Sequence, residues 1–283
     1  MSNDLGLSFQ ATAGWFSAEQ RASYRFISIS PEQATALPTA LGMAIRRCYI
    51  SDEKVSTQAI KYPPATKVIA AALPDPGSVM SGEFGEILTY FYQGSTALPT
   101  VAVGLRRWHL KQDRNKAAPY SDVVHLVLPD WPNPSAHDAV LCSEVKAKST
   151  KGKFEPIKKA IEGCDTDRIS RLAGTLSWLR ERAITGATEG ASVEQLTRFI
   201  EPAGLPSAIK KFQAVAVVCD SLVTEETAKT PATPSPDYEV VVISVPKLKD
   251  TYEAAYTTAM NAVPQAQVGA APAKAASSLD SSI

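Results

Sequence analysis

The chain has 283 residues, with 29 Lys and Arg balanced by 29 Asp and Glu, so its formal net charge is zero. This length suits one large domain or two small ones with a buried core. The balance excludes a chain that is basic throughout, but not a nucleic-acid partner, since a groove needs only a local positive patch. Residues 106–159 contain eleven basic and six acidic side chains, although the lysines of 151–159 alone are more typical of a solvated loop.

The positions of cysteine and apolar residues disfavour several protein classes. Cys48, Cys142, Cys164 and Cys219 form no C-x-x-C pair, so a structural zinc site is not expected. The N-terminus lacks a signal region, and no apolar run approaches the roughly 18 residues that a membrane helix needs. We therefore expect a cytoplasmic protein with reduced cysteines and no membrane partner.

The first 75 residues predict an α+β extension without an evident chemical motif. Residues 23–30 are typical of a strand. A helix is expected from Pro31, because Ser30 can cap it, but Pro38 should interrupt it. A turn-rich cluster ends this unit, and we interpret residues 1–75 as a candidate docking unit for a partner.

A helix is predicted over residues 81–92, with Ser81 as its cap. Glu83 and Glu86 are three residues apart, so they should be neighbours on its surface. The buried face follows the i, i+3, i+4, i+7 pattern and consists of Phe84, Ile87, Leu88 and Phe91.

Three strands are expected after this helix, over residues 100–110, 121–129 and 138–149. An amphipathic helix over 166–184 should follow, and its predicted buried face consists of Ile169, Leu172, Ala173, Leu176 and Leu179.

The runs 214–223 and 239–245 are apolar throughout, which predicts strands covered on both faces. A short helix over 249–262 and a low-complexity, disordered tail over 263–283 complete the chain. Helices that alternate with a mixed sheet predict an α/β domain over residues 76–262.

A group of charged residues on the predicted sheet points to chemistry. Glu144 and Lys146 are two residues apart on a strand, so they share a face, and Asp122 begins the preceding strand. If the strands are neighbours, the two carboxylates repel each other unless they share a proton or a cation. Mg²⁺ or Mn²⁺ is the natural occupant, with the Val145 carbonyl as a further oxygen ligand.

Lys146 would then have a function beyond that of an ion pair. Beside a metal and a phosphate, its ammonium can orient a water for attack or stabilise the charge that builds on the phosphate. Metal, carboxylates and ammonium together make a phosphodiester-cleaving centre, which a glutamate from the helix before the strands would complete.

The order Asp122 and then Glu144-x-Lys146 on the next strand resembles the PD-(D/E)xK nuclease superfamily. The resemblance implies a restriction-endonuclease-like core: a helix that carries an acid, three antiparallel strands, a helix and further strands. Ser121 stands where that superfamily often has a proline. The resemblance in element order covers about residues 60–250.

Four stretches carry a more specific resemblance. "GEFGEIL", "RRWHLKQDRN", "SDVVHLVL" and "SEVKAKS", all within residues 82–149, resemble the HamA-like nuclease subunit of Hachiman-type antiphage defence systems. The resemblance implies a metal-dependent DNA nuclease that hydrolyses phosphodiester bonds. It also implies an effector role in a complex with a superfamily 2 helicase encoded alongside.

The resemblance assigns roles residue by residue. Asp122 and Glu144 would bind the metal, and Lys146 would be the catalytic lysine. Gly82-x-x-x-Glu86 matches the spacing of the family's helix acid, which favours Glu86, with Glu83 as the alternative. The expected DNA-binding residues are Lys111, Lys148 and Arg107.

Other interpretations stay open. Glu144 and Lys146 are also compatible with a plain ion pair on a strand edge. The chain could be a catalytically inactive nuclease fold that binds DNA or acts as a scaffold, although the expected charged residue types are all present. A metabolic α/β enzyme is disfavoured, because the sequence has no glycine-rich nucleotide loop. His109, His125 and His137 suit no common zinc site, and Cys142 is interpreted as a small buried hydrophobe.

Overall fold

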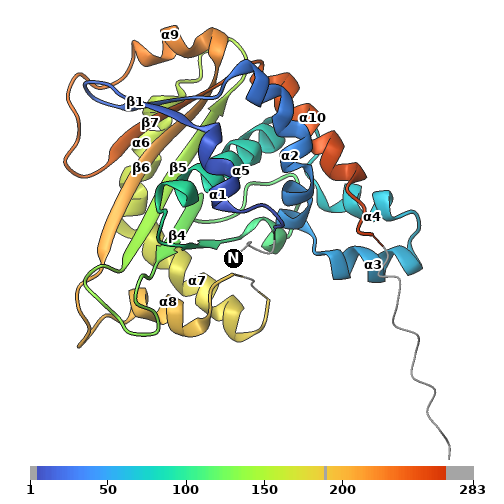
Figure 1. Ribbon diagram of the computed structural model, residues 1–283, viewed down its shortest axis with the longest axis horizontal. Helices are drawn as coiled ribbons and strands as arrows, with labels where there is room; N and C mark the ends of the chain where they lie inside the picture. The colour runs from blue at the N-terminus through green and yellow to red at the C-terminus, as the bar shows by residue number, and fades with distance from the viewer. Residues whose placement is uncertain (1–4, 188–189, 266–283) are drawn as a thin grey trace, which may run out of the picture.

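The computed structural model describes residues 5–187 and 190–265. In these residues, seven strands form one mixed sheet in the order β1-β2-β7-β6-β5-β4-β3, and helices cover both of its faces (Figure 1). The strands are β1 (Ser17–Gln20), β2 (Arg25–Ser28), β3 (Ala102–Leu105), β4 (Val123–Val127), β5 (Ala139–Lys148), β6 (Ile209–Cys219) and β7 (Glu239–Val245).

The sheet has an antiparallel half and a parallel half. β3, β4 and β5 pair antiparallel, whereas β5, β6, β7 and β2 pair parallel, and β1 pairs antiparallel with β2. The predicted mixed α/β sheet is therefore confirmed, including three antiparallel strands in series. The predicted strand over 100–110 is too long, because residues Trp108–Leu110 form a 3-10 turn after β3.

The helices lie in two layers. The described helices are α1 (Phe9–Thr12), α2 (Pro31–Tyr49), α3 (Asp52–Lys61), α4 (Ala65–Ala72), α5 (Ser78–Thr96), α6 (Pro156–Thr166), α7 (Leu172–Ile184), α8 (Val193–Ile200), α9 (Val223–Thr227) and α10 (Leu248–Asn261). One large core joins α2, α5 and α10 to the sheet, and a second joins α7 and α8 to its antiparallel half. No described helix is both long and apolar enough to span a membrane.

The N-terminal residues are part of the main sheet. β2 pairs with β7 in parallel, and α2 packs against α10. Ser30 caps α2 as predicted, but the helix continues through Pro38, so the expected interruption there is wrong. How the chain divides into domains stays a prediction, and most of the predicted C-terminal tail lies outside the described residues.

α5 differs from its prediction at the start and on one face. It begins at Ser78 after Gly77, three residues before the expected cap Ser81. Phe84 and its apolar partners are buried as predicted. Glu83 and Glu86 are buried too, so the prediction that they lie on the helix surface is wrong. Each of the two buried carboxylates is accommodated by an ion pair with a cationic side chain.

The predicted helix over 166–184 begins at the last residue of α6 and consists of a π-helical turn followed by α7. The turn spans Asp167–Arg171, between α6 and α7. Because a π-turn holds an extra residue, the face predicted from a regular 3.6-residue period does not extend back through it. Leu176 is buried as expected, but Ile169 is 83% exposed and Ala173 is exposed.

Candidate active site

The site lies where β4 and β5 separate. β4 pairs with β5 up to the opposing residues Val123 and Ser143. Within the described residues, β5 continues beyond this point with only β6 as its partner. The backbone edge of β5 is thus left open beside Asp122, which precedes β4. This fork brings the three predicted polar residues together, because Glu144 and Lys146 follow Ser143.

Asp122 takes the place of a strand partner for β5. Its Oδ2 accepts a hydrogen bond from the backbone N–H of Val145 at 2.9 Å. Its Oδ1 accepts from Nη2 of Arg107 at 2.9 Å, and the Arg107 Nε donates to the Asp122 carbonyl at 2.9 Å. Since Arg107 also donates to the carbonyls of Ala118 and Pro119, it fixes the segment that leads into β4.

The ammonium of Lys146 lies among three oxygens from two elements. Nζ donates to Glu144 Oε1, to the Val145 carbonyl at 3.0 Å, and to Asp122 Oδ2 at 3.5 Å. The predicted proximity of Glu144 and Lys146 is thus confirmed. Glu144 is almost fully buried, whereas the Lys146 side chain is 30% exposed.

Glu144 has a second cationic partner that the sequence analysis missed. Its Oε2 accepts from Nη2 of Arg171, which comes from the π-turn. The Arg171 Nε donates to Asp167 Oδ1 at 2.6 Å. The i, i+4 spacing of Asp167 and Arg171 is the sequence signal for this pair.

Glu86 joins the site through Arg107. Its Oε2 accepts from Nη2 of Arg107 at 3.0 Å and from the Trp108 indole at 2.8 Å. The same guanidinium nitrogen therefore bridges Glu86 and Asp122. Burial, together with the charge of Asp122, raises the pKa of Glu86 to about 8, although the charge of Arg107 opposes this.

Glu83, the alternative helix acid, belongs to a different cluster. Its Oε1 accepts from Lys111 Nζ at 2.6 Å, and its Oε2 accepts from the Tyr49 hydroxyl at 2.7 Å. Neither group contacts Asp122 or Glu144. The structure therefore links Glu86, rather than Glu83, to the fork.

All three expected DNA-binding residues have buried side chains in ion pairs. Arg107 and Lys111 have the carboxylate partners already described. Lys148 is buried as well and donates to Glu226 at 2.7 Å and to the Gly152 carbonyl at 2.8 Å. Direct contact of these three with DNA stays a prediction, and it would require each to leave a carboxylate.

The electrostatics of the fork favour a bound cation. Burial, and then the charge of Asp122, raise the pKa of Glu144 to about 7. Burial lowers the pKa of Lys146, but the carboxylates Asp122 and Glu144 more than offset it, so the pKa of Lys146 is raised overall. The carboxylates thus stabilise positive charge at the position of this ammonium.

The donor set fits a hard divalent cation better than zinc. Oxygens of Asp122, Glu144 and the Val145 carbonyl already surround one cation, the Lys146 ammonium. The described residues contain no group of three or more His, Cys, Asp or Glu arranged to hold a metal ion. Two carboxylates and a carbonyl are nevertheless sufficient for Mg²⁺, which usually completes its shell with waters and substrate phosphate oxygens.

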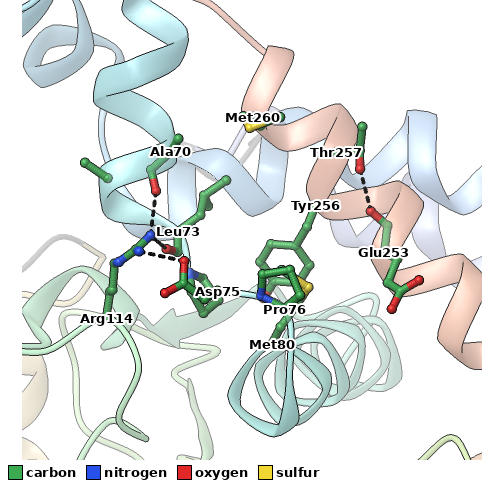
Figure 2. A pocket seen from close by; sticks show the side chains of 12 residues that line it. Ala70, Leu73, Asp75, Pro76, Met80, Arg114, Glu253, Tyr256, Thr257 and Met260 are labelled. Carbon is green, nitrogen blue, oxygen red and sulfur yellow. Dashed lines mark hydrogen bonds and ion pairs between the residues drawn. The ribbon is translucent and has the colours of Figure 1, made fainter.

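An apolar cavity of about 760 Å³ lies apart from these acids, between α4, the start of α5 and α10 (Figure 2). Leu73, Met80 and Tyr256 are among its lining residues, and Arg114 with Asp75 forms an ion pair at its edge. None of the fork residues lines it, so it is not the candidate active site.

His125 and Cys142 both lie in the interior of the protein. His125 is fully buried, and its Nδ1 pairs with Gln93 Oε1 at 2.7 Å. Cys142 is buried among apolar side chains, as interpreted from the sequence.

Comparison with known proteins gives one informative result. The family model of HamA matches residues 20–259, well over half of the chain. Among curated proteins, nothing matched the chain. The matched segment begins before β2 and ends within α10, so it includes the whole fork. The chain therefore belongs to the HamA family, that of a component of the Hachiman antiphage defence system.

Proposed function

We propose that the chain is a metal-dependent deoxyribonuclease that hydrolyses phosphodiester bonds as the effector of a Hachiman complex. The observation that carries the proposal is the fork between β4 and β5, where three oxygens surround the ammonium of Lys146. The arrangement of one helix acid, three antiparallel strands and a further helix supports a restriction-endonuclease-like core.

The residues fit a metal with oxygen ligands. Mg²⁺ or Mn²⁺ held by Asp122, Glu144 and the Val145 carbonyl would supply Lewis acidity toward a phosphate and a bound water of lowered pKa. Lys146 then leaves the oxygens that it now contacts, and its partly exposed side chain can place Nζ on the phosphate. There it stabilises the charge that builds during hydrolysis.

The surrounding residues keep the acids in place during this exchange. The Val145 N–H and Arg107 fix the two oxygens of Asp122. Glu86 holds Arg107 in turn, which gives the helix acid an orienting role. The acids thus remain in position when Lys146 moves, because each retains another donor.

DNA reaches the site over a basic surface in this proposal. Lys151 and Lys153 are exposed on the loop that directly follows β5, the strand that carries Glu144 and Lys146. Contacts between such lysines and phosphates are independent of sequence and weaken as salt rises. The buried cations Arg107, Lys111 and Lys148 contribute mainly by shaping the site.

HamA family membership suggests association with the HamB helicase. We propose that this helicase restrains the nuclease and docks on the N-terminal residues 1–75. Ile60 and Tyr62, at the end of α3, support this assignment, because they are apolar and 86% and 50% exposed.

Point substitutions test this docking surface better than a deletion, since removing residues 1–75 would also remove β2 and α2 from the core. Ile60→Asp with Tyr62→Ser should abolish co-purification with the helicase. Ile184→Asp is the matched control, because Ile184 ends α7 and is 66% exposed, a value between those of Ile60 and Tyr62. Full co-purification of the double variant would place the interface elsewhere.

Plasmid degradation tests the nuclease proposal itself. The purified chain should degrade DNA with Mg²⁺ and stop when a chelator is added. Glu144→Ala should abolish cleavage, whereas Glu162→Ala, which removes an exposed carboxylate on α6, should not. A Glu144→Ala protein that cleaves at the wild-type rate would refute the assignment of Glu144. A wild-type chain that binds DNA or a partner but cleaves no DNA would leave the alternative, an inactive fold.

A further inference from the structure

The carboxylate of Glu144 is held from both sides by cations. Lys146 binds Oε1, and Arg171 binds Oε2. The same Arg171 nitrogen that contacts Oε2 also donates to the Gly163 carbonyl at 2.8 Å, while Nε is bound to Asp167. A guanidinium that is held by three acceptors can fix the orientation of a carboxylate plane. A single hydrogen bond about which the carboxylate can rotate cannot do this.

The backbone around Glu144 is shaped for this contact. A Cβ on Gly163 would lie 2.3 Å from Glu144 Oε1, so only glycine allows α6 to approach this closely. Arg171 is the last residue of the π-turn that follows α6. Turns of this kind are rare and occur frequently at functional sites.

Asp167 connects the two acids of the site. It is almost fully buried and binds Arg171 on the Glu144 side. It also accepts from the Ser121 hydroxyl at 2.7 Å, and the Ser121 N–H donates to Thr175 on α7. Since Ser121 immediately precedes Asp122, one buried network fixes both the start of β4 and the carboxylate on β5.

We infer that Arg171 is a positioning residue, which holds Glu144 in the orientation needed to bind the metal. This inference rests on the proposed nuclease function. Arg171 is assigned to positioning because its Nε and Nη2 are engaged by Asp167, Glu144 and the Gly163 carbonyl. When Lys146 leaves Glu144, Arg171 is the contact that remains on that carboxylate. Substitution of Arg171 should therefore have its largest effect on the metal-bound site.

The test must separate geometry from charge, because removing a cation beside a metal site would by itself favour metal binding. Arg171→Lys keeps the charge and loses the planar fork. Arg168→Lys is the matched control. Arg168 lies in the same turn, its side chain is 27% exposed against 25% for Arg171, and it pairs with Asp165 and Asp237 instead of the acids of the fork.

The primary measurement is the binding of Mn²⁺ alone by calorimetry. Loss of such an orienting partner typically costs about 10- to 100-fold in metal affinity or activity, so Arg171→Lys should weaken Mn²⁺ binding by about tenfold. It should lower kcat by a similar factor, with KM for plasmid DNA changed less than about threefold. Arg168→Lys should leave all three values within about twofold of wild type, which a purely structural role of the turn would not predict.

A second variant covers the case in which lysine substitutes well for arginine. The double change Asp167→Asn with Arg171→Met removes the pair without changing the net charge, so a loss of Mn²⁺ affinity again reports geometry. If both variants are folded and match wild type in Mn²⁺ affinity and kcat, the inference is overturned. If the double variant does not fold, the result for Arg171→Lys decides. A wild-type chain that neither binds Mn²⁺ nor cleaves DNA would instead refute the proposed function.

Discussion

The pairs Glu83–Lys111 and Glu144–Lys146 contain the same chemical groups in different surroundings. Both members of the first pair are buried, and they are 2.6 Å apart. Lys111 also donates to the Arg114 carbonyl, and Glu83 accepts from Tyr49. These contacts surround the pair with protein groups, and the Lys111 side chain is only 4% exposed.

The second pair is open on one side. Lys146 is partly exposed, and its ammonium faces oxygens that come from β5 and from the start of β4. A cation held by several oxygens beside solvent can be replaced by another cation. A buried glutamate next to a lysine is therefore not in itself a sign of function. The sign is the convergence of several oxygens on an accessible point.

The largest effect should come from removing the open lysine. Lys146→Ala should lower plasmid cleavage by about a thousandfold, because the charge that builds on the phosphate loses its nearest cation. DNA affinity should change little, since one lysine is one of many phosphate contacts. Filter binding and single-turnover cleavage, measured on the same preparation, would check this. A loss of binding as large as the loss of cleavage would indicate a binding module.

The closed lysine should show the opposite behaviour. Lys111→Met leaves Glu83 buried without its cation, and breaking a buried pair in this way costs about 3–5 kcal/mol of stability. Urea unfolding would measure it, with Lys116→Met, at an exposed position, as the control. If the variant lost cleavage while its stability stayed within about 1 kcal/mol of wild type, Lys111 would be assigned to the active site instead.

A smaller effect is expected at His125, a buried polar group that binds Gln93 of α5. Burial lowers the pKa of His125 to about 3. The unfolded chain binds this proton near pH 6.5, so stability is present above that pH and is lost as pH falls toward 3. His125→Phe should therefore reduce the stability loss between pH 7 and pH 5 by about 2 kcal/mol. An unchanged pH dependence in urea unfolding would contradict this account.

Much of the fold followed from the sequence because period and composition are local properties. The strand over 239–245 has the predicted bounds, and Phe84, Ile87, Leu88 and Phe91 are buried as the spacing indicated, although α5 is buried on all sides from Glu83 to Gly94. The π-turn was missed, because a regular 3.6-residue period was assumed across Asp167–Arg171. The role of β2 in the main sheet was missed as well, since pairing with β7 joins residues more than 200 positions apart.

The candidate site was predictable where it depends on strand alternation. Asp122, Glu144 and Lys146 meet because antiparallel neighbours bring them together at the fork. Arg171 was not found, since its approach depends on how α6 and α7 pack onto the sheet. The burial of Lys148 was also not foreseeable, because its partner Glu226 comes from a distant segment.

Lys146 and a divalent cation should compete for the same oxygens, and this competition can be measured. Mn²⁺ binding to the wild-type chain and to Lys146→Ala can be compared by calorimetry, without DNA. The account predicts about tenfold tighter binding to Lys146→Ala, because the ammonium no longer occupies the shared oxygens or repels the metal. Equal or weaker Mn²⁺ binding by the variant, or no binding by either protein, would contradict it.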